Sequence, residues 1–159
     1  MTARVAALNR SDGGVPKLPV AAAIVTARGM AGDRQRNLKH HGGPERALCI
    51  YSLERIAALK REGHPIEPGS VGENVTVEGL EWSRVAPGAR LRLGVVLAEV
   101  TGYTTPCKTI RGAFADRNSM RISQERHPGW SRVYARVLRE GLIRVGDPVE
   151  LLGAADATP

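Results

Sequence analysis

Aromatic residues are scarce in this chain, at 4% of its 159 residues, so a folded core must rest on Val, Leu, Ile and Ala. The only cysteines are Cys49 and Cys107, which excludes a disulfide framework and a C-x-x-C motif. So few thiols suit a reducing compartment. The first residues lack a secretory signal pattern, and no apolar run is long enough to span a bilayer. We therefore expect a cytoplasmic protein with no membrane partner.

Acidic residues are in the minority, because 16 Asp and Glu face 23 Lys and Arg, for a net charge of +7. This balance favours anionic partners such as phosphate-bearing ligands, acidic surfaces or nucleic acid. Few aromatics, no recognised nucleic-acid motif and basic residues spread along the chain argue against a nucleic-acid-binding module. The glycine motifs of P-loops and of dinucleotide-binding folds are also absent. The charge thus predicts a small anionic ligand rather than a polyanion.

Turn-forming residues are abundant, with 18 Gly and 10 Pro, which indicates many short strands. Strands are expected near residues 4–9, 20–25, 46–51, 71–77, 90–93, 95–100 and 142–152. Ser52 is expected to cap a helix that ends at Gly63. Apolar residues from Trp130 to Leu138 follow the spacing i, i+3, i+4, i+7, i+8, which predicts a second, amphipathic helix.

These elements point to a fold class, because helices between most strands, as a parallel α/β sheet requires, are missing. We predict a mainly β, β-rich α+β fold. Its sheet should be mostly antiparallel and barrel-like, with about two peripheral helices. Residues 1–153 are expected to form a single domain, and residues 154–159 a short loose tail.

The turn that carries Cys107 is the strongest candidate for chemistry. A strand-like run over residues 95–100 leads into Gly102 and Pro106, which break regular backbone. The thiol stands among three threonines and beside Lys108, surroundings that favour thiolate, the form that acts as nucleophile or metal ligand. The histidines lack the paired spacing of zinc sites, although His41 or His127 could serve Cys107 as a base.

Three further polar stretches break regular structure, and together they suit a small anion beside a thiolate. They are Gly13–Lys17, Gly32–Arg46 and Gly72-Glu73-Asn74. Glycines let backbone N–H groups approach an anion, and basic side chains neutralise it. Glu73 could be a base, although a strand-end carboxylate paired with an arginine is the simpler interpretation. Asn74 could bind a ligand or cap its own turn.

Other polar or reactive residues have simpler interpretations. Cys49 lies within an apolar run, which indicates a small core residue. Trp130 and Tyr134 stand at core spacing, which indicates packing. The basic side chains on the opposite side of that predicted helix are expected in solvent; they are Arg132, Arg136 and Arg139.

The order of these motifs resembles the MOSC domain, a family named for the C-terminal domain of molybdenum-cofactor sulfurases. The resemblance covers nearly the whole chain and rests on Gly32-Asp33-Arg34, on residues 41–47, on Tyr51-Ser52, on residues 72–76, on Pro106-Cys107 and on residues 134–147. It implies a β-rich barrel-like fold with the cysteine at its site.

The resemblance implies two alternative roles for Cys107. As the molybdenum ligand of a bound molybdenum cofactor (molybdopterin), it would serve an enzyme that reduces N-hydroxylated small molecules. As a persulfide carrier, it would deliver sulfur for metal–sulfur centres. The residues implied to bind the cofactor are Lys17, Arg34, His41, Gly42, Gly43, Arg46, Glu73, Asn74, Thr104 and Thr105. A reductase would need a separate electron-donor protein, because two cysteines cannot hold an iron–sulfur cluster.

Overall fold

The strands of this protein form two sheets, which a computed structural model describes over residues 2–34 and 43–153. The strands are β1 (Arg4–Arg10), β2 (Leu18–Val20), β3 (Ala22–Thr26), β4 (Gly29–Met30), β5 (Leu48–Ser52), β6 (Val75–Glu78), β7 (Arg90–Leu93), β8 (Val96–Tyr103), β9 (Val133–Arg139), β10 (Gly141–Arg144) and β11 (Val149–Leu152). The helices are α1 (Leu53–Arg61) and the short 3-10 helices η1 (Pro44–Arg46), η2 (Trp82–Arg84), η3 (Lys108–Ala113) and η4 (Ser119–Ile122).

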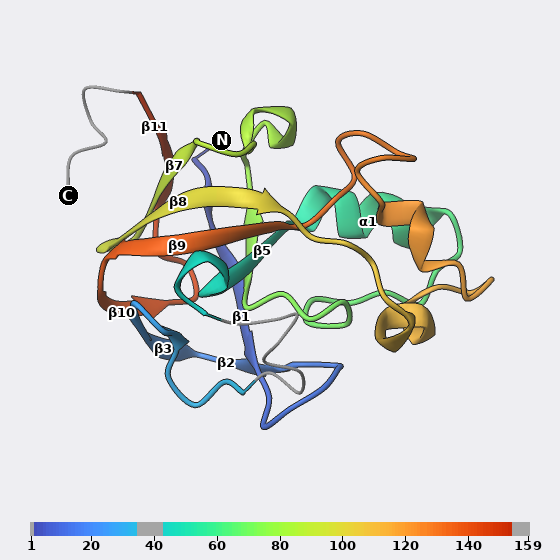
Figure 1. Ribbon diagram of the computed structural model, residues 1–159, viewed down its shortest axis with the longest axis horizontal. Coiled ribbons are helices and arrows are strands. Elements are labelled where there is room, and N and C mark those ends of the chain that lie inside the picture. The colour runs from blue at the N-terminus through green and yellow to red at the C-terminus, as the bar shows by residue number, and fades with distance from the viewer. Residues whose placement is uncertain (1, 35–42, 154–159) are drawn as a thin grey trace.

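The larger sheet has eight strands in the order β11-β7-β8-β9-β5-β6-β1-β2, and only its β5–β6 pair is parallel. The smaller sheet has the order β10-β3-β4. In Figure 1, β8 and β9 run side by side across the middle of the molecule, and α1 lies beyond the end of β5. The mainly β, mostly antiparallel fold predicted from the sequence is confirmed.

The larger sheet curls without closing into a barrel, because β11 and β2 are its two edges. The start of β1 nevertheless meets the chain just before β11. Val5 N donates to Asp147 O at 2.9 Å, and Val149 N donates to Ala3 O at 3.0 Å. The expected barrel-like shape therefore holds only in this looser sense.

Two local predictions are confirmed where side-chain pattern and turn chemistry agree. In β7, Leu91 and Leu93 are fully buried, while Arg90 and Arg92 alternate with them on the other face. Ser52 caps the start of helix α1, and its Oγ accepts a hydrogen bond from Arg55 N at 3.2 Å. This is the α-helix that the sequence predicted. Among the described helices, none is both long and apolar enough to cross a membrane.

The second predicted helix is wrong, because residues 133–139 form strand β9. Val133 and Val137 are four residues apart, and that spacing puts two side chains on one face of a strand as well as of a helix. β9 lies between β8 and β5 and pairs with both. Hydrogen bonding on both edges, with Val133 and Ala135 fully buried, outweighs the local helical pattern.

Candidate functional site

A pocket of about 710 Å³ lies beside the ends of β5, β8 and β9. Its lining consists of Gly14, Val15, Lys17, Arg34, Arg46, Cys49, Val71, Gly72, Asn74, Tyr103, Thr105, Pro106, Cys107, Lys108, Thr109, Ile110, Arg132 and Tyr134. Five of these side chains are cationic, and no lining residue in the described part of the chain is acidic. The lining also contains apolar and aromatic side chains. The pocket thus suits an anion that also has a flat or apolar part.

The floor of the pocket follows one row across the large sheet. Cys49 in β5 is the register partner of Tyr134 in β9, which is the partner of Gly102 in β8. Residues directly opposite in neighbouring strands share a face. On the other side of β5, Asn74 N donates to Cys49 O at 2.8 Å. Gly102, at the end of the row, is not itself a lining residue, and an added Cβ there would meet nothing within 4 Å.

The wall nearest the end of β8 carries the predicted thiol. Cys107 is half-buried and immediately precedes η3, and its Sγ lies 2.7 Å from Thr109 Oγ1. Thr105 is exposed and also lines the pocket. Thr104 does not line it, because its side chain is buried and its N–H donates to Arg132 O at 3.1 Å. Of the two threonines predicted at the site, the structure therefore brings only Thr105 to the pocket.

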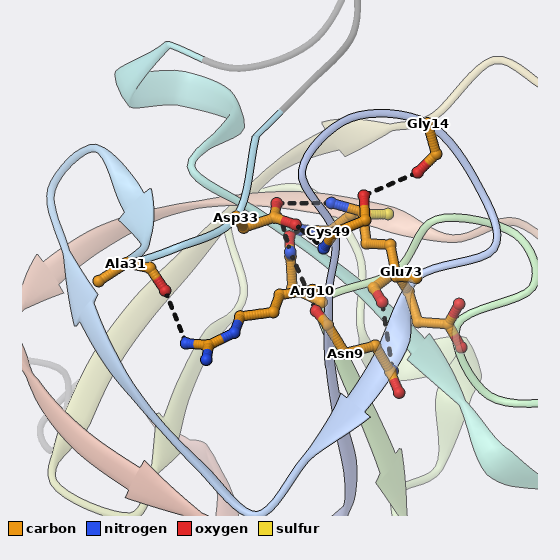
Figure 2. A network of polar contacts seen from close by, with 10 residues as sticks. Asn9, Arg10, Gly14, Ala31, Asp33, Cys49 and Glu73 are labelled. Atoms are coloured by element: carbon orange, nitrogen blue, oxygen red, sulfur yellow. Dashed lines mark hydrogen bonds and ion pairs between the residues drawn. The ribbon is translucent and has the colours of Figure 1, made fainter.

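Asp33 links the loop that carries Lys17 to Asn74, the residue just before β6 (Figure 2). Its Oδ2 accepts from Lys17 Nζ at 2.5 Å and from Asn74 Nδ2 at 2.9 Å, and its Oδ1 accepts from Ser11 N at 2.9 Å. Lys17 is only 7% exposed, and its ion pair with the buried Asp33 carboxylate neutralises its charge. The other end of the Asn74 amide, Oδ1, accepts from Cys49 N at 3.0 Å. Asn74 therefore fixes the floor of the pocket and has little capacity left for a ligand.

The remaining predicted cations lie at the more open parts of the pocket. The Arg34 side chain is 76% exposed, and its Nη1 is 3.9 Å from Asp12 Oδ1. The Arg46 guanidinium lies over the Tyr134 ring, 5.4 Å from its centroid, where the two attract one another. Gly43 is described but does not line the pocket. His41 and Gly42 lie outside the described residues.

Glu73 is placed behind the pocket instead of inside it. Its side chain is fully buried, and Oε2 accepts from Thr76 Oγ1 at 3.1 Å. Asn9 Nδ2 donates to the Glu73 carbonyl at 3.2 Å, as Figure 2 shows. Burial raises the pKa of this carboxyl to about 6, because the charged form is poorly solvated there. Glu73 thus supports the loop that carries Asn74, without reaching the pocket.

Arg132 was missed, since it was expected in solvent and is instead 6% exposed in the pocket lining. Its Nη1 donates to Val71 O at 2.6 Å, while its Nε is buried with no hydrogen-bond partner in the described structure. Reading residues 133–139 as a strand paired with β8 would have placed Arg132 opposite Thr104, next to the Cys107 turn. Because this segment was assigned a helical periodicity, Arg132 was placed in solvent and missed as a pocket residue.

Cys49 is buried, as the sequence predicted, but it faces the pocket from the floor. Burial raises the pKa of its thiol to about 11, which keeps it protonated near neutral pH. The two cysteines therefore line one pocket in different states of exposure. Within the described ranges, no cluster of three or more His, Cys, Asp or Glu residues could hold a metal ion by itself.

Comparison with known proteins gives consistent matches. A model of the MOSC domain matches residues 37–150. The uncharacterized protein YflK of Bacillus subtilis strain 168 is 31% identical over 145 residues, which are 90% of this chain and 65% of YflK. YiiM of Escherichia coli K12 is 31% identical over 134 residues, which are 81% of this chain and 58% of YiiM. The chain thus spans less than two thirds of the length of these relatives.

Among solved structures, YiiM from Geobacillus stearothermophilus has a similar fold, with a TM-score of 0.71 and 26% identity. The alignment covers 95% of this chain and 75% of that one.

Proposed function

This chain belongs to the MOSC domain family, and from that membership and its pocket we propose that it binds the molybdenum cofactor and reduces N-hydroxylated compounds. In this proposal Cys107 is the catalytic residue and the ligand of molybdenum. Electrons come from a separate donor protein, and the substrate is a small molecule. The net reaction consumes two electrons and two protons, converts an N–OH group to N–H, and releases water.

One observation carries the proposal: a half-exposed thiol and five cationic side chains line the same pocket, with no carboxylate among its described lining. The cofactor is a phosphate ester that carries a thiolate-binding metal. A thiol is a soft ligand that suits such a metal, and arginine and lysine suit the phosphate. The pocket volume of about 710 Å³ is in the range of small-molecule sites. The residues present therefore fit the group.

The residues of the chain divide the task of holding this ligand. Arg34, Arg46 and Lys108 are exposed side chains of the lining, where they would attract and neutralise the phosphate. Asp33 fixes both Lys17 and Asn74, so the floor keeps its shape whether or not a ligand is bound. When bound, the cofactor would supply the two-electron redox chemistry. The protons would reach the substrate from solvent through the open side of the pocket.

A second function is favoured by the contact between Cys107 Sγ and Thr109 Oγ1 at 2.7 Å. A hydroxyl at that distance can donate to a Cys107 thiolate, which would take the outer sulfur of a persulfide donor and release that donor as a thiolate. In this alternative the protein carries sulfur for metal–sulfur centres and retains no cofactor.

Metal content separates the two functions. We expect near-stoichiometric molybdenum, with fluorescent pterin after oxidation, in wild-type protein expressed in a cofactor-producing host. Cys107→Ser should lose at least tenfold of the molybdenum while keeping its fold by circular dichroism, because an alcohol is a poor ligand for a soft metal site.

Cys49→Ser is the matched control, since it changes the other thiol of the same pocket. It should retain molybdenum and lose stability, because it buries a hydroxyl in the sheet. A different result would favour the sulfur carrier over the reductase. In it, wild-type protein contains no molybdenum but carries cyanide-labile sulfur, and Cys107→Ser lacks that sulfur. Wild-type protein that contains no molybdenum and no labile sulfur would refute both functions.

A further inference from the structure

Arg132 is a buried cation without an anionic partner in the described structure. It is 6% exposed, and among the described residues its side chain forms one hydrogen bond, from Nη1 to Val71 O at 2.6 Å. Its Nε is buried and unpaired, and no carboxylate of residues 2–34 or 43–153 lies within ion-pair distance. This differs from Lys17, the other buried cation of the lining, which is paired with Asp33.

Such an arrangement is costly unless something else neutralises it. A buried charge without a partner loses its hydration, and neutralisation by proton loss is closed to arginine. Burial raises the pKa of Glu73, and the charge of Arg132 lowers it by a smaller amount. The Glu73 oxygen that forms a hydrogen bond accepts from Thr76 instead. Glu73 therefore offsets the charge of Arg132 from a distance and leaves its donors unmatched.

The backbone holds Arg132 in place for a ligand. Its carbonyl accepts from Thr104 N at 3.1 Å, which ties it to the turn before Cys107. Its guanidinium bonds to Val71, beside the Gly72 turn on the other side of the pocket. The group thus spans two walls of the pocket, and these contacts fix its position before an anion arrives. Pre-ordered donors of this kind lower the entropic cost of binding.

We propose that Arg132 is the receptor for a tetrahedral oxyanion of the phosphate type at the buried side of this pocket. If that oxyanion is the phosphate of the cofactor, the assignment rests on the proposed function. If the oxyanion is free phosphate or the phosphate of a substrate, the assignment is independent of the proposed function. A planar guanidinium presents paired N–H donors to phosphate oxygens, which a lysine in its place could not reproduce.

The test uses full-length protein from a host that makes no molybdenum cofactor. The melting temperature is followed as inorganic phosphate replaces chloride at constant ionic strength and pH 7. A ligand that binds the folded state alone raises the melting temperature with its concentration. The variants are Arg132→Met, which removes the charge at similar length, and Arg132→Lys. Arg139→Gln is the control, an exposed arginine of β9 outside the pocket.

We expect phosphate to stabilise the wild type and Arg139→Gln alike. Arg132→Met should bind phosphate at least tenfold more weakly, and Arg132→Lys should fall between. Without phosphate, Arg132→Met should melt no lower than the wild type, because it removes an unpaired buried charge. If Arg132→Met fails to fold, the comparison of Arg132→Lys with the wild type decides. An equal phosphate response in wild type and variants, or no response in the wild type, would overturn the proposal.

A second arm in a cofactor-producing host identifies the source of the oxyanion. Pterin that is bound by the wild type and lost from Arg132→Met assigns the receptor to the cofactor phosphate. A phosphate response that depends on Arg132, in a protein that retains no pterin, keeps this receptor and refutes the proposed cofactor. Equal pterin content in both proteins, with an equal phosphate response, refutes the receptor and leaves the proposed function standing.

Discussion

Single residues in this pocket acquire their chemistry from burial and from the atoms beside them. Cys49 and Cys107 have the same side chain, yet Cys49 is buried in the floor and its thiol pKa is raised to about 11. Cys107 is half-exposed, with a hydroxyl of Thr109 at its sulfur. A reactive thiol needs access to solvent or ligand. Exposure therefore favours Cys107 as the functional residue.

Glu73 gives a prediction for pH dependence. Its pKa in the folded protein is about 6 against an ordinary value of 4.5, so the folded state binds the proton more tightly than the unfolded state. The contribution of Glu73 to stability therefore falls as pH rises from about 4.5 to above 6, because this carboxyl ionises more easily in the unfolded chain. Glu73→Gln removes this titration. Relative to wild type, the variant should gain about 2 kcal/mol between pH 4.5 and pH 7.

Urea unfolding of both proteins at several pH values measures this gain. Glu62 provides the control, because it is an exposed carboxyl paired with Arg121. Its pKa is lowered, chiefly by the hydrogen bonds from Arg121, so Glu62→Gln should give a trend of the opposite sign. Stability curves for wild type and Glu73→Gln that run parallel across this range would refute the assignment.

At the level of elements, backbone contacts between strands and between loops maintain the geometry of the site. β9 is a strand because β8 and β5 supply partners on both of its edges. The loop that carries Lys17 is held similarly, since Lys17 N donates to Gly69 O at 2.9 Å. The two backbone segments approach so closely there that a Cβ on Gly69 would lie 2.2 Å from Lys17 O. Gly69 therefore sets the distance between this loop and the turn that precedes β6.

Gly69→Ala should accordingly disturb both the fold and the pocket. Gly69 has a φ of +87°, so the variant suffers backbone strain and a clash with Lys17 O. Gly63→Ala is the matched control, because Gly63 has a φ of +99° with nothing within 4 Å. We expect a cost of about 1–2 kcal/mol for the control from the backbone alone. Gly69→Ala should cost about 1–3 kcal/mol more.

Urea unfolding measures both costs. The phosphate response of Gly69→Ala should also weaken, since the Lys17 wall must move, whereas Gly63→Ala should keep it. Equal costs for the two variants would show that the contact with Lys17 is easily relieved.

At the level of the whole molecule, the curl of the large sheet joins the two ends of the described chain. Val5, near the start, donates to Asp147 and accepts from Gly146 N at 2.8 Å, and Val149 donates to Ala3. Val5 and Val149 are both buried. Figure 1 shows the N-terminus beside β7 and β11 accordingly. This seam stabilises the curl although the sheet does not close.

Hydrogen exchange tests whether the seam belongs to the cooperative core. The amides of Val5, Gly146 and Val149 should exchange only through global unfolding, because opening any of them exposes buried side chains. The Gly63 amide, which bonds to Lys60 O at the end of α1, should exchange faster through local fraying. Seam amides that exchange as fast as Gly63 would show that the two ends separate independently.

The sequence by itself determined the features that local chemistry controls. Alternation of Arg and Leu specified β7, the Ser52 cap specified α1, and the abundance of turns specified a mainly β fold. The ordered motifs specified the family, and with it the candidate role of Cys107. Lys17, Arg34, Arg46, Asn74 and Thr105 were predicted together with Cys107, and the fold brings all of them to one pocket.

Only the tertiary structure decided what depends on partners distant in sequence. The segment 133–139 carries a pattern that suits helix or strand, and pairing with β8 and β5 made it a strand. That choice buried Arg132 and placed Tyr134 beside Cys49. Thr104 and Glu73 turn away from the pocket for the same kind of reason. Local sequence fixes turns and caps, whereas burial and strand pairing arise from contacts that no short window of sequence contains.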